Sequence, residues 1–506
     1  MARRSKNVEL VNNFYYKGNL TDEQVRTLDT LYELGKVENL KNIFKHKNVT
    51  LHDFQTLDIA LCYYNPKFII GERPGSGKTL IAAGLLETLK RKGKLNKKVL
   101  CVTKSDSLYQ FSNEISYFTD LKLMELYGDS KRIQKLVSNN NIDTYNGIVI
   151  PHNTIINNYF NVFMSENKHK FGTLIFDESS VLKSHKTRTY EVAKQLFKNI
   201  ERIVMLNGTV FELNIYDFIN QISILDEDIL PPKYKIERDY CVFGFGNGYW
   251  STVNGKRKYN RTWELKGYKN QEEFREKVHY FYVQHNRKEG PEHTFALVPV
   301  GISDVQKNIV DDSNYMFVLS SPNTEFYRFD FSRKNVPKLG VLVDLVKDVV
   351  KSKPVIYCFY LDAQQVIKQE LEKEGISSVI LNGAVELEAR DAIRQKFVET
   401  NEHDVLITNV QKAINLPTSD VLIFYTIPSN PAMAYQIMCR IDRNNYLVSK
   451  DYFFLCVVNS REGDIILDIV KDREINANLF SGHDRIVFQR IASQIEEIRK
   501  KSGYSK

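Results

Sequence analysis

The feature of this chain that most restricts its fold is a set of short apolar runs that do not alternate with polar residues. Each run is rich in Val, Ile, Leu and Phe, and polar residues or glycine bound it. Strands buried on both faces of a parallel sheet have this pattern, whereas strands with one solvated face alternate. The runs are KVLCVT (98–103), TLIFDE (173–178), RIVMLNGT (202–209), PVIYCFY (354–360), SVILNG (378–383), DVLITN (404–409), VLIFYT (421–426) and YFFLCVV (452–458).

Helical patterns lie between these runs, for example at 79–94, 363–375 and 387–399. Strands that alternate with helices indicate α/β layers. The alternation comes in two blocks, and a chain of 506 residues is too long for a single core. The sequence therefore predicts an α/β protein with two parallel-sheet lobes.

The composition changes between the two blocks, where aromatic, glycine and basic residues gather, and short helical patterns lie at both ends of the chain. We predict an inserted α-rich segment there and small helical terminal elements. The predicted domains are an N-terminal helical element (1–45), lobe 1 (46–228), the inserted segment (229–335), lobe 2 (336–475) and a C-terminal helix (476–506).

The first block contains a glycine-rich loop between a strand and a helix, FIIGERPGSGKT (68–79). Gly75 and Gly77 let main-chain N–H groups turn inward, and the helix that follows points its positive end at phosphates. Lys78 can reach the β- and γ-phosphates of a nucleotide, while the Thr79 hydroxyl can bind Mg²⁺. The loop, which includes Ser76, predicts an ATP site although Glu72 stands where the strict pattern has glycine.

A second acidic site follows about a hundred residues later, in LIFDESS. Asp177 ends an apolar run, where it can hold Mg²⁺ through water. Glu178 is placed to polarise the attacking water. The sequence therefore predicts Asp177 as a nucleotide and metal residue and Glu178 as catalytic.

The order of motifs resembles the SWI/SNF-type branch of superfamily two, the double-stranded DNA translocases. LHDFQTLDIAL (51–61) is similar to the branch's L-R-x-Y-Q-x-x-G, ERPGSGKT to DEMGLGKT, and DESSVLK to DEGHxxK, with Ser180 at the histidine position. The resemblance implies two RecA-like lobes with ATP and Mg²⁺ between them. It also implies that Gln55 contacts the adenine.

The resemblance continues into the second block, where MAYQIMCRIDR keeps the Q-x-x-x-R-x-x-R spacing. It implies that Arg440 and Arg443, one helical turn apart, stabilise charge on the transferred phosphate. In lobe 1, Thr209 is implied to link the γ-phosphate state to the grip on DNA. Further DNA contacts are assigned to Lys104, Lys183 and Asn409.

The inserted segment resembles a stretch of fork-remodelling, annealing-helicase-like relatives, and Cys241, Trp263, Gly267, Asn270 and Glu273 fit their pattern. Basic residues with interleaved aromatics can also grip DNA. On that basis the segment's basic run is assigned to DNA or, equally, to a solvated surface. The run consists of Lys256, Arg257 and Lys258.

The bulk properties agree with an anionic partner, because the net charge is +8 and the pI is about 8.8. We expect a monomer that acts on duplex, forked or branched DNA, with replication or recombination proteins as possible partners. With no apolar run of membrane length and no signal-peptide pattern, we expect no membrane and a cytoplasmic location. The asparagine-, lysine- and tyrosine-rich make-up suits a viral protein, for which the location is the host cytoplasm.

Six widely spaced cysteines without a C-x-x-C pair predict buried free thiols. Three other functions stay open at this point. They are an RNA helicase or transcript-release factor, the motor subunit of a defence or restriction complex, and a non-catalytic protein that kept the fold.

Overall fold

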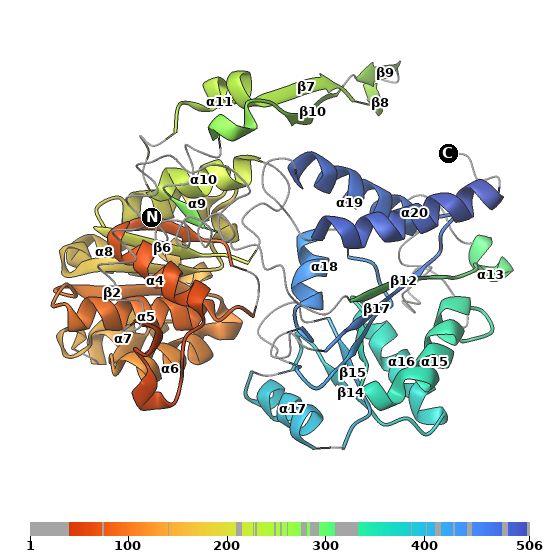
Figure 1. The fold of residues 1–506 in the computed structure, drawn as a ribbon, viewed down its shortest axis with the longest axis horizontal. Helices are drawn as coiled ribbons and strands as arrows, with labels where there is room; N and C mark the ends of the chain where they lie inside the picture. The colour runs from red at the N-terminus through yellow and green to blue at the C-terminus, as the bar shows by residue number, and fades with distance from the viewer. Residues whose placement is uncertain are drawn as a thin grey trace, which may run out of the picture. The chain divides into compact units, whose positions relative to one another are not determined.

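A computed structural model gives the fold of the chain (Figure 1). No helix in the part of the chain that it describes is long and apolar enough to cross a membrane. The structure describes residues 40–72, 75–139, 141–208, 215–225, 227, 230–246, 249–253, 256–260, 262–274, 281–283, 293–308, 332–385, 387–400, 402–409, 416–428, 431–442, 448–477 and 484–502.

The chain divides into two compact units, which we call lobe 1 (Met1–Asn286 with Ile475–Ser481) and lobe 2 (Arg287–Glu474 with Gly482–Lys506). Lobe 1 contains a seven-stranded sheet in the order β11-β1-β6-β5-β2-β4-β3, in which all pairings are parallel. The predicted parallel sheet is confirmed. Its strands are β1 (Lys67–Ile70), β2 (Lys98–Thr103), β3 (Leu123–Glu125), β4 (Gly147–Pro151), β5 (Phe171–Asp177), β6 (Arg202–Leu206) and β11 (Tyr282–Val283).

Successive residues of these strands enter two different cores, which explains why the runs are apolar throughout. In β2, Val99 and Cys101 pack on one side of the sheet, and Leu100 and Val102 pack on the other. One side is covered by α4 (Asp53–Tyr64), α5 (Lys78–Arg91) and α6 (Leu108–Thr119). The other is covered by α8 (Asn158–Asn167), α9 (Arg188–Phe197) and α10 (Ile215–Leu225), while α7 (Ser130–Asn139) lies beside α8.

Lobe 2 repeats this design with a six-stranded parallel sheet in the order β12-β17-β16-β13-β15-β14. Helices α15 and α16 pack on one side of the sheet, and α17 to α20 pack on the other. The elements are β12 (Thr294–Pro299), α15 (Pro337–Val349), β13 (Val355–Tyr357), α16 (Leu361–Lys373), β14 (Ser378–Leu381), α17 (Leu387–Glu399), β15 (Val405–Thr408), β16 (Val421–Phe424), α18 (Pro431–Met438), β17 (Asp451–Cys456), α19 (Arg461–Ala477) and α20 (Asp484–Ser502).

The segment between the two blocks differs from the α-rich insertion that we predicted. Its described part consists mainly of strands, with the helices α11 (Lys233–Tyr240) and α13 (Asp304–Lys307). Strands β7 (Cys241–Phe245) and β10 (Trp263–Tyr268) form one antiparallel pair, and β8 (Tyr249–Val253) and β9 (Lys256–Asn260) form another (Figure 1). The Asn-Gly pair in VNGK was the hairpin signal that sequence reasoning overlooked.

Parts of this segment also complete the two sheets, since β11 joins lobe 1 and β12 joins lobe 2. The predicted N-terminal helical pattern lies almost entirely outside the described residues. The predicted C-terminal helix is present as α20, and buried Arg499 ties it to lobe 2 by donating to Asp464 (2.9 Å) and to the main-chain oxygen of Val458.

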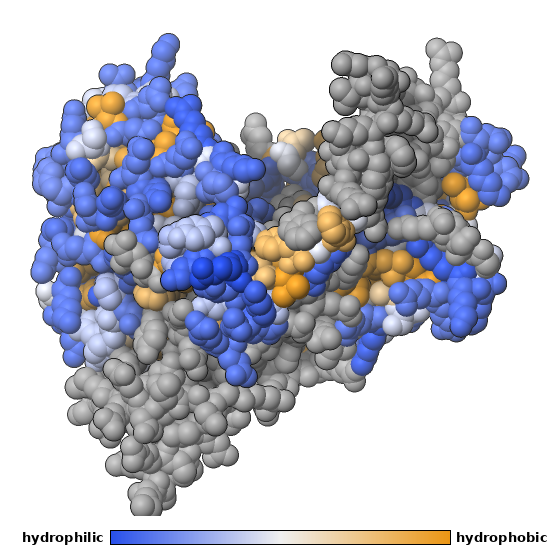
Figure 2. All heavy atoms as spheres, turned by 90° about the horizontal axis from the view of Figure 1, so that it is seen from above, coloured by the Kyte–Doolittle hydropathy of each residue, from blue (hydrophilic) through white to orange (hydrophobic). Residues whose placement is uncertain are grey.

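All six cysteines are free and buried, which confirms the predicted buried thiols. On the face drawn in Figure 2, the described residues are mostly hydrophilic, and hydrophobic ones occur in scattered groups. The apolar side chains are therefore used mainly in the cores on the two sides of each sheet.

Candidate nucleotide site

The glycine-rich loop of lobe 1 has the backbone that a phosphate loop needs. It begins after β1, and Gly75 and Gly77 have φ values of 84° and 81°. These left-handed conformations favour glycine. A Cβ atom on Gly77 would lie 2.6 Å from the side-chain nitrogen of Gln55, so any larger residue would collide there. Helix α5 then begins at Lys78.

Gln55 holds this loop from α4. Its Oε1 accepts from the main-chain N–H of His52 (2.9 Å), and its Nε2 donates to the main-chain oxygen of Ser76 (2.8 Å). Gln55 is buried, and both ends of its amide have a main-chain partner. The structure therefore assigns Gln55 a role in shaping the loop, while the adenine contact stays a prediction.

The main chain of Glu72 binds the side chain of Lys78. The Lys78 ammonium donates to the main-chain oxygen of Glu72 (2.9 Å), and Glu72 itself is buried. This contact uses the backbone of residue 72 rather than its side chain, so the position does not need a glycine. This hydrogen bond holds the Lys78 side chain against the main chain at the start of the loop.

The acidic pair follows β5 at the carboxyl edge of the same sheet. Thr103, at the end of the neighbouring strand β2, donates its hydroxyl to Asp177 Oδ2 (2.9 Å). His152 Nε2 donates to the main-chain oxygen of Asp177 (2.8 Å). Sequence reasoning missed Thr103 and His152, although both follow apolar strands whose ends must meet Asp177 in a parallel sheet.

The surroundings of Asp177 raise the pKa of its carboxyl group. Burial, followed by the neighbouring charge of Glu178, raises the pKa of Asp177 to about 6. The Thr103 hydrogen bond and the charges of Lys78 and Lys104 act in the opposite direction. A cation bound beside Asp177 would offset the cost of its charge.

Glu178 stands in a strained conformation, because its φ of 52° lies in the left-handed region. Lys104 Nζ lies 3.3 Å from Glu178 Oε2. Lys104 was predicted to contact DNA, and the structure places it beside Glu178. Its DNA contact stays a prediction.

The arginine motif is only partly described, because Arg443 and the threonine Thr209 lie outside the described residues. Arg440 is buried in lobe 2, with its Nε donating to the main-chain oxygen of Gln436 (3.1 Å). Helix α18 ends at Met438, so Arg440 lies beyond the helix on which we had expected both arginines. That burial depends on tertiary contacts and could not be deduced from the spacing.

The remaining predicted DNA residues belong to different lobes, Lys183 to lobe 1 and Asn409 to lobe 2. The main-chain oxygen of Lys183 accepts from Asn220 Nδ2 (2.5 Å), and Asn409 Nδ2 donates to the main-chain oxygen of Phe359 (3.4 Å). The basic run 256–258 lies in β9, but its side chains are outside the description. The structure thus brings together the ATP-site residues of lobe 1, and the DNA contacts stay predictions.

The residues of lobe 1 fit ATP with Mg²⁺. The buried Ser76 hydroxyl has no hydrogen-bond partner among the described residues, and a phosphate oxygen would supply one. The N-terminus of α5 with Lys78 supplies positive charge, Thr79 supplies a hydroxyl, and Asp177 at the end of β5 supplies a carboxylate that the Lys78 charge reaches. This is the donor set that a triphosphate with its metal requires.

Comparison with known proteins agrees with this site. Residues 24–240 match the SNF2-related domain, and residues 337–445 match the helicase conserved C-terminal domain. The chain therefore carries an SNF2-related domain followed by a helicase conserved C-terminal domain, a pair that indicates an ATP-dependent helicase or translocase. The predicted resemblance to superfamily two is therefore confirmed, whereas the comparisons give no support to a viral origin.

Two curated relatives of this chain are SWI/SNF-related matrix-associated actin-dependent regulators of chromatin, subfamily A-like protein 1. The Caenorhabditis elegans homolog is 23% identical over 331 residues, which cover 60% of this chain and 45% of the relative. The Drosophila melanogaster protein is 22% identical over 326 residues, which cover 61% of this chain and 41% of the relative. The chain spans less than half the length of either relative.

One solved structure shows the same fold, and a second is more distantly similar. Saccharomyces cerevisiae Dbp5 bound to RNA and ADP BeF3 is 14% identical with a TM-score of 0.51, covering 90% of this chain and 97% of Dbp5. The Sulfolobus solfataricus SWI2/SNF2 ATPase core in complex with dsDNA is 15% identical with a TM-score of 0.40, covering 89% and 97%. The predicted pair of RecA-like lobes is confirmed.

The raised pKa of Asp177 gives a prediction for the nucleotide-free enzyme. Replacement of Asp177 by asparagine should raise the melting temperature more at pH 8 than at pH 5. The pKa is about 6 in the folded chain against an ordinary value of 3.8, so folding becomes less favourable as pH rises between these values. Scanning fluorimetry checks this, with an expected extra gain of about 2–4 °C at pH 8. A larger gain at pH 5 would contradict the assignment.

Proposed function

We propose that this enzyme is a DNA translocase that spends ATP to move along duplex DNA and to remodel forks or branched DNA. The observation that carries the proposal is a complete phosphate loop and acidic pair in a lobe that matches the SNF2-related domain. The names of the two curated relatives, both SWI/SNF-related, support DNA as the substrate class. Fork or junction remodelling is the finer part of the proposal, supported by the resemblance of residues 241–273 to fork-remodelling relatives.

The chemistry follows from the side chains of the chain. ATP supplies the energy, and Mg²⁺ supplies charge neutralisation at the phosphates. Lys78 would bind the phosphates, and Thr79 and Asp177 would hold the metal ion. Glu178 orients the attacking water and accepts its proton.

The positive charge that the transition state requires is assigned to the arginine motif. Arg440 donates within lobe 2, so its part in this is to support the segment that leads to Arg443. This division of roles is our proposal. It predicts that Arg443→Ala lowers kcat more than removal of an exposed surface arginine would.

The deciding experiment measures the ATPase rate with duplex DNA, a fork, a four-way junction, single-stranded DNA and RNA at matched nucleotide concentration. We expect the strongest stimulation by forked or four-way DNA and clear stimulation by plain duplex. Equal stimulation by duplex and branched DNA would remove the remodelling part of the proposal. Stronger stimulation by RNA than by any DNA would replace it with an RNA helicase.

The basic run in β9 gives a separate prediction. Simultaneous replacement of Lys256, Arg257 and Lys258 by alanine should weaken binding to duplex DNA and reduce the slope of log K against log salt by roughly 2 to 3. Fluorescence anisotropy at several salt concentrations measures both quantities. The matched control is Lys198→Ala with Lys122→Ala, two exposed charges elsewhere on lobe 1. An unchanged slope in the triple variant would mean that the run is only a solvated surface.

A further inference from the structure

Helix α10 places a buried amide, Gln221, at the centre of a hydrogen-bonded cluster in lobe 1. Gln221 Oε1 accepts from Ser179 Oγ (2.6 Å) and from Asn207 Nδ2 (3.2 Å). Gln221 Nε2 donates to the main-chain oxygen of Asp217 (2.7 Å). Ser179, Asn207 and Gln221 are all 0% exposed, so water does not compete for these bonds.

The two partners of Gln221 belong to different functional segments. Ser179 directly follows Glu178, the proposed catalytic carboxylate. Asn207 follows β6 and precedes Gly208, in the turn that leads to Thr209. The main-chain N–H of Asn207 also donates to the oxygen of Ile70 (2.9 Å), the last residue of β1 ahead of the phosphate loop.

A second amide of α10 acts on the same region. Asn220 Nδ2 donates to the main-chain oxygen of Lys183 (2.5 Å), four residues after Ser179. Residues 179–183, which directly follow the acidic pair, are therefore fastened to α10 at both ends. The strained backbone of Glu178 lies just ahead of this fastened stretch, and such conformations persist only where the surroundings hold them.

Hydrogen bonds of this kind transmit displacement because they are directional. If the acidic segment moved away from α10, the buried Ser179 hydroxyl would lose its acceptor, and a buried donor without a partner is unfavourable. The same acceptor atom serves Asn207. A displacement of Ser179 therefore favours a matching displacement of Asn207, and the reverse.

We propose that Gln221 is a positioning residue that couples the acidic pair to the turn at Asn207 and Gly208. Through Ser179, it fixes the Glu178 carboxylate for hydrolysis, and through Asn207, it relates that position to the segment that leads to Thr209. This inference rests on the proposed role of Glu178 in hydrolysis.

The test compares Gln221→Met with the wild-type chain in steady-state ATPase assays at saturating duplex DNA. Methionine keeps the length of the side chain and removes the acceptor. We expect kcat to fall by about tenfold or more, while KM for ATP stays within about twofold. Gln221→Glu retains an acceptor for Ser179 and Asn207, and it should recover a substantial part of kcat. Ser223→Ala is the control, because it removes a hydroxyl on α10 that bonds to the main-chain oxygen of Ile219 and to Tyr190 and not to Ser179 or Asn207.

A second measurement separates positioning from stability. Ser179→Ala should lower kcat alone, but it should add little in the Gln221→Met background, because both changes remove the same bond. Effects that multiply would overturn the proposal. So would a Gln221→Met variant that melts at a lower temperature yet keeps the wild-type kcat, since Gln221 would then serve only stability.

Two further measurements distinguish failure of the coupling from misfolding of the variant and from a wrong role for Glu178. If Gln221→Met does not fold, a double-mutant cycle of Ser179→Ala and Asn207→Ala replaces it. Effects on kcat that simply multiply in the double variant would then overturn the coupling. If Glu178→Gln hydrolyses ATP at the wild-type rate, the proposed role of Glu178 is wrong, whereas wild-type kcat in Gln221→Met alone refutes only the coupling.

Discussion

Replacement of Lys78 by alanine is expected to lower kcat for ATP hydrolysis by roughly two to three orders of magnitude. The Lys78 ammonium is held over the phosphate loop by the main-chain oxygen of Glu72, at the start of α5. From there it is the cation placed to meet charge that develops on the transferred phosphate. Alanine removes that charge, and the loop backbone, which the left-handed Gly75 and Gly77 define, stays in place.

The measurement is a steady-state ATPase assay with and without duplex DNA, together with a melting curve. Lys92→Ala is the matched control, because Lys92 is an exposed lysine just beyond the other end of α5. The control should keep the wild-type rate. Turnover within about threefold of wild type in Lys78→Ala would remove the phosphate loop from the mechanism.

The strands were predictable because burial on both faces of a sheet leaves a continuous apolar signal. The run 98–103 coincides with β2, whose residues alternate between two cores. The run 354–360 extends beyond β13 (Val355–Tyr357), because the pattern records burial and not where pairing ends. Glycine and polar punctuation thus locate strands well and their ends less well.

The middle segment was harder, since its aromatic and basic residues fit several structures. Four of its described strands form two antiparallel pairs, and β11 and β12 join the parallel sheets of the two lobes. The glycine loop and Asp177 could be predicted because their chemistry fixes the residue types. The coupling amide Gln221 could not, because a glutamine on a helix gives no sign of burial until the tertiary fold surrounds it.

The lobe-1 site also shows why the position of a charge matters more than its presence. Lys104 was a candidate for DNA on residue type alone, and the structure instead brings it 3.3 Å from Glu178. Arg440 was a candidate for the transition state and is buried in lobe 2. A basic residue near a motif can pair with DNA, with a nucleotide or with a carboxylate of the protein, and the sequence alone does not distinguish these partners.

Glu178→Gln should lower kcat by roughly two to four orders of magnitude while leaving ATP binding nearly intact. Glutamine has the same shape and tolerates the same left-handed backbone, but it cannot accept a proton from water. Lys104 would lose its ion pair with residue 178, which is a partly buried contact, so a small change in melting temperature is expected as well.

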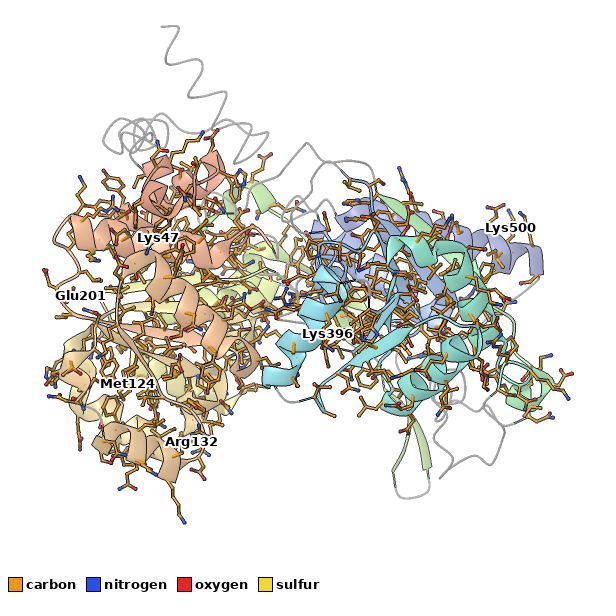
Figure 3. All side chains as sticks on the ribbon, turned by 90° about the horizontal axis from the view of Figure 1, so that it is seen from below. Lys47, Met124, Arg132, Glu201, Lys396 and Lys500 are labelled. Atoms are coloured by element: carbon orange, nitrogen blue, oxygen red, sulfur yellow. The ribbon has the colours of Figure 1, made fainter. Side chains whose placement is uncertain are left out.

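Binding is measured with a fluorescent ATP analogue, and turnover by phosphate release in single- and multiple-turnover modes. Glu201→Gln is the matched control, because Glu201 forms an exposed ion pair with Lys97 on the surface of lobe 1 (Figure 3). Loss of turnover with retained nucleotide binding identifies Glu178 as the residue that acts on the water. A variant that loses binding and turnover together would instead place Glu178 in holding the loop, and the base would have to be sought among the other carboxylates at the carboxyl edge of the lobe-1 sheet.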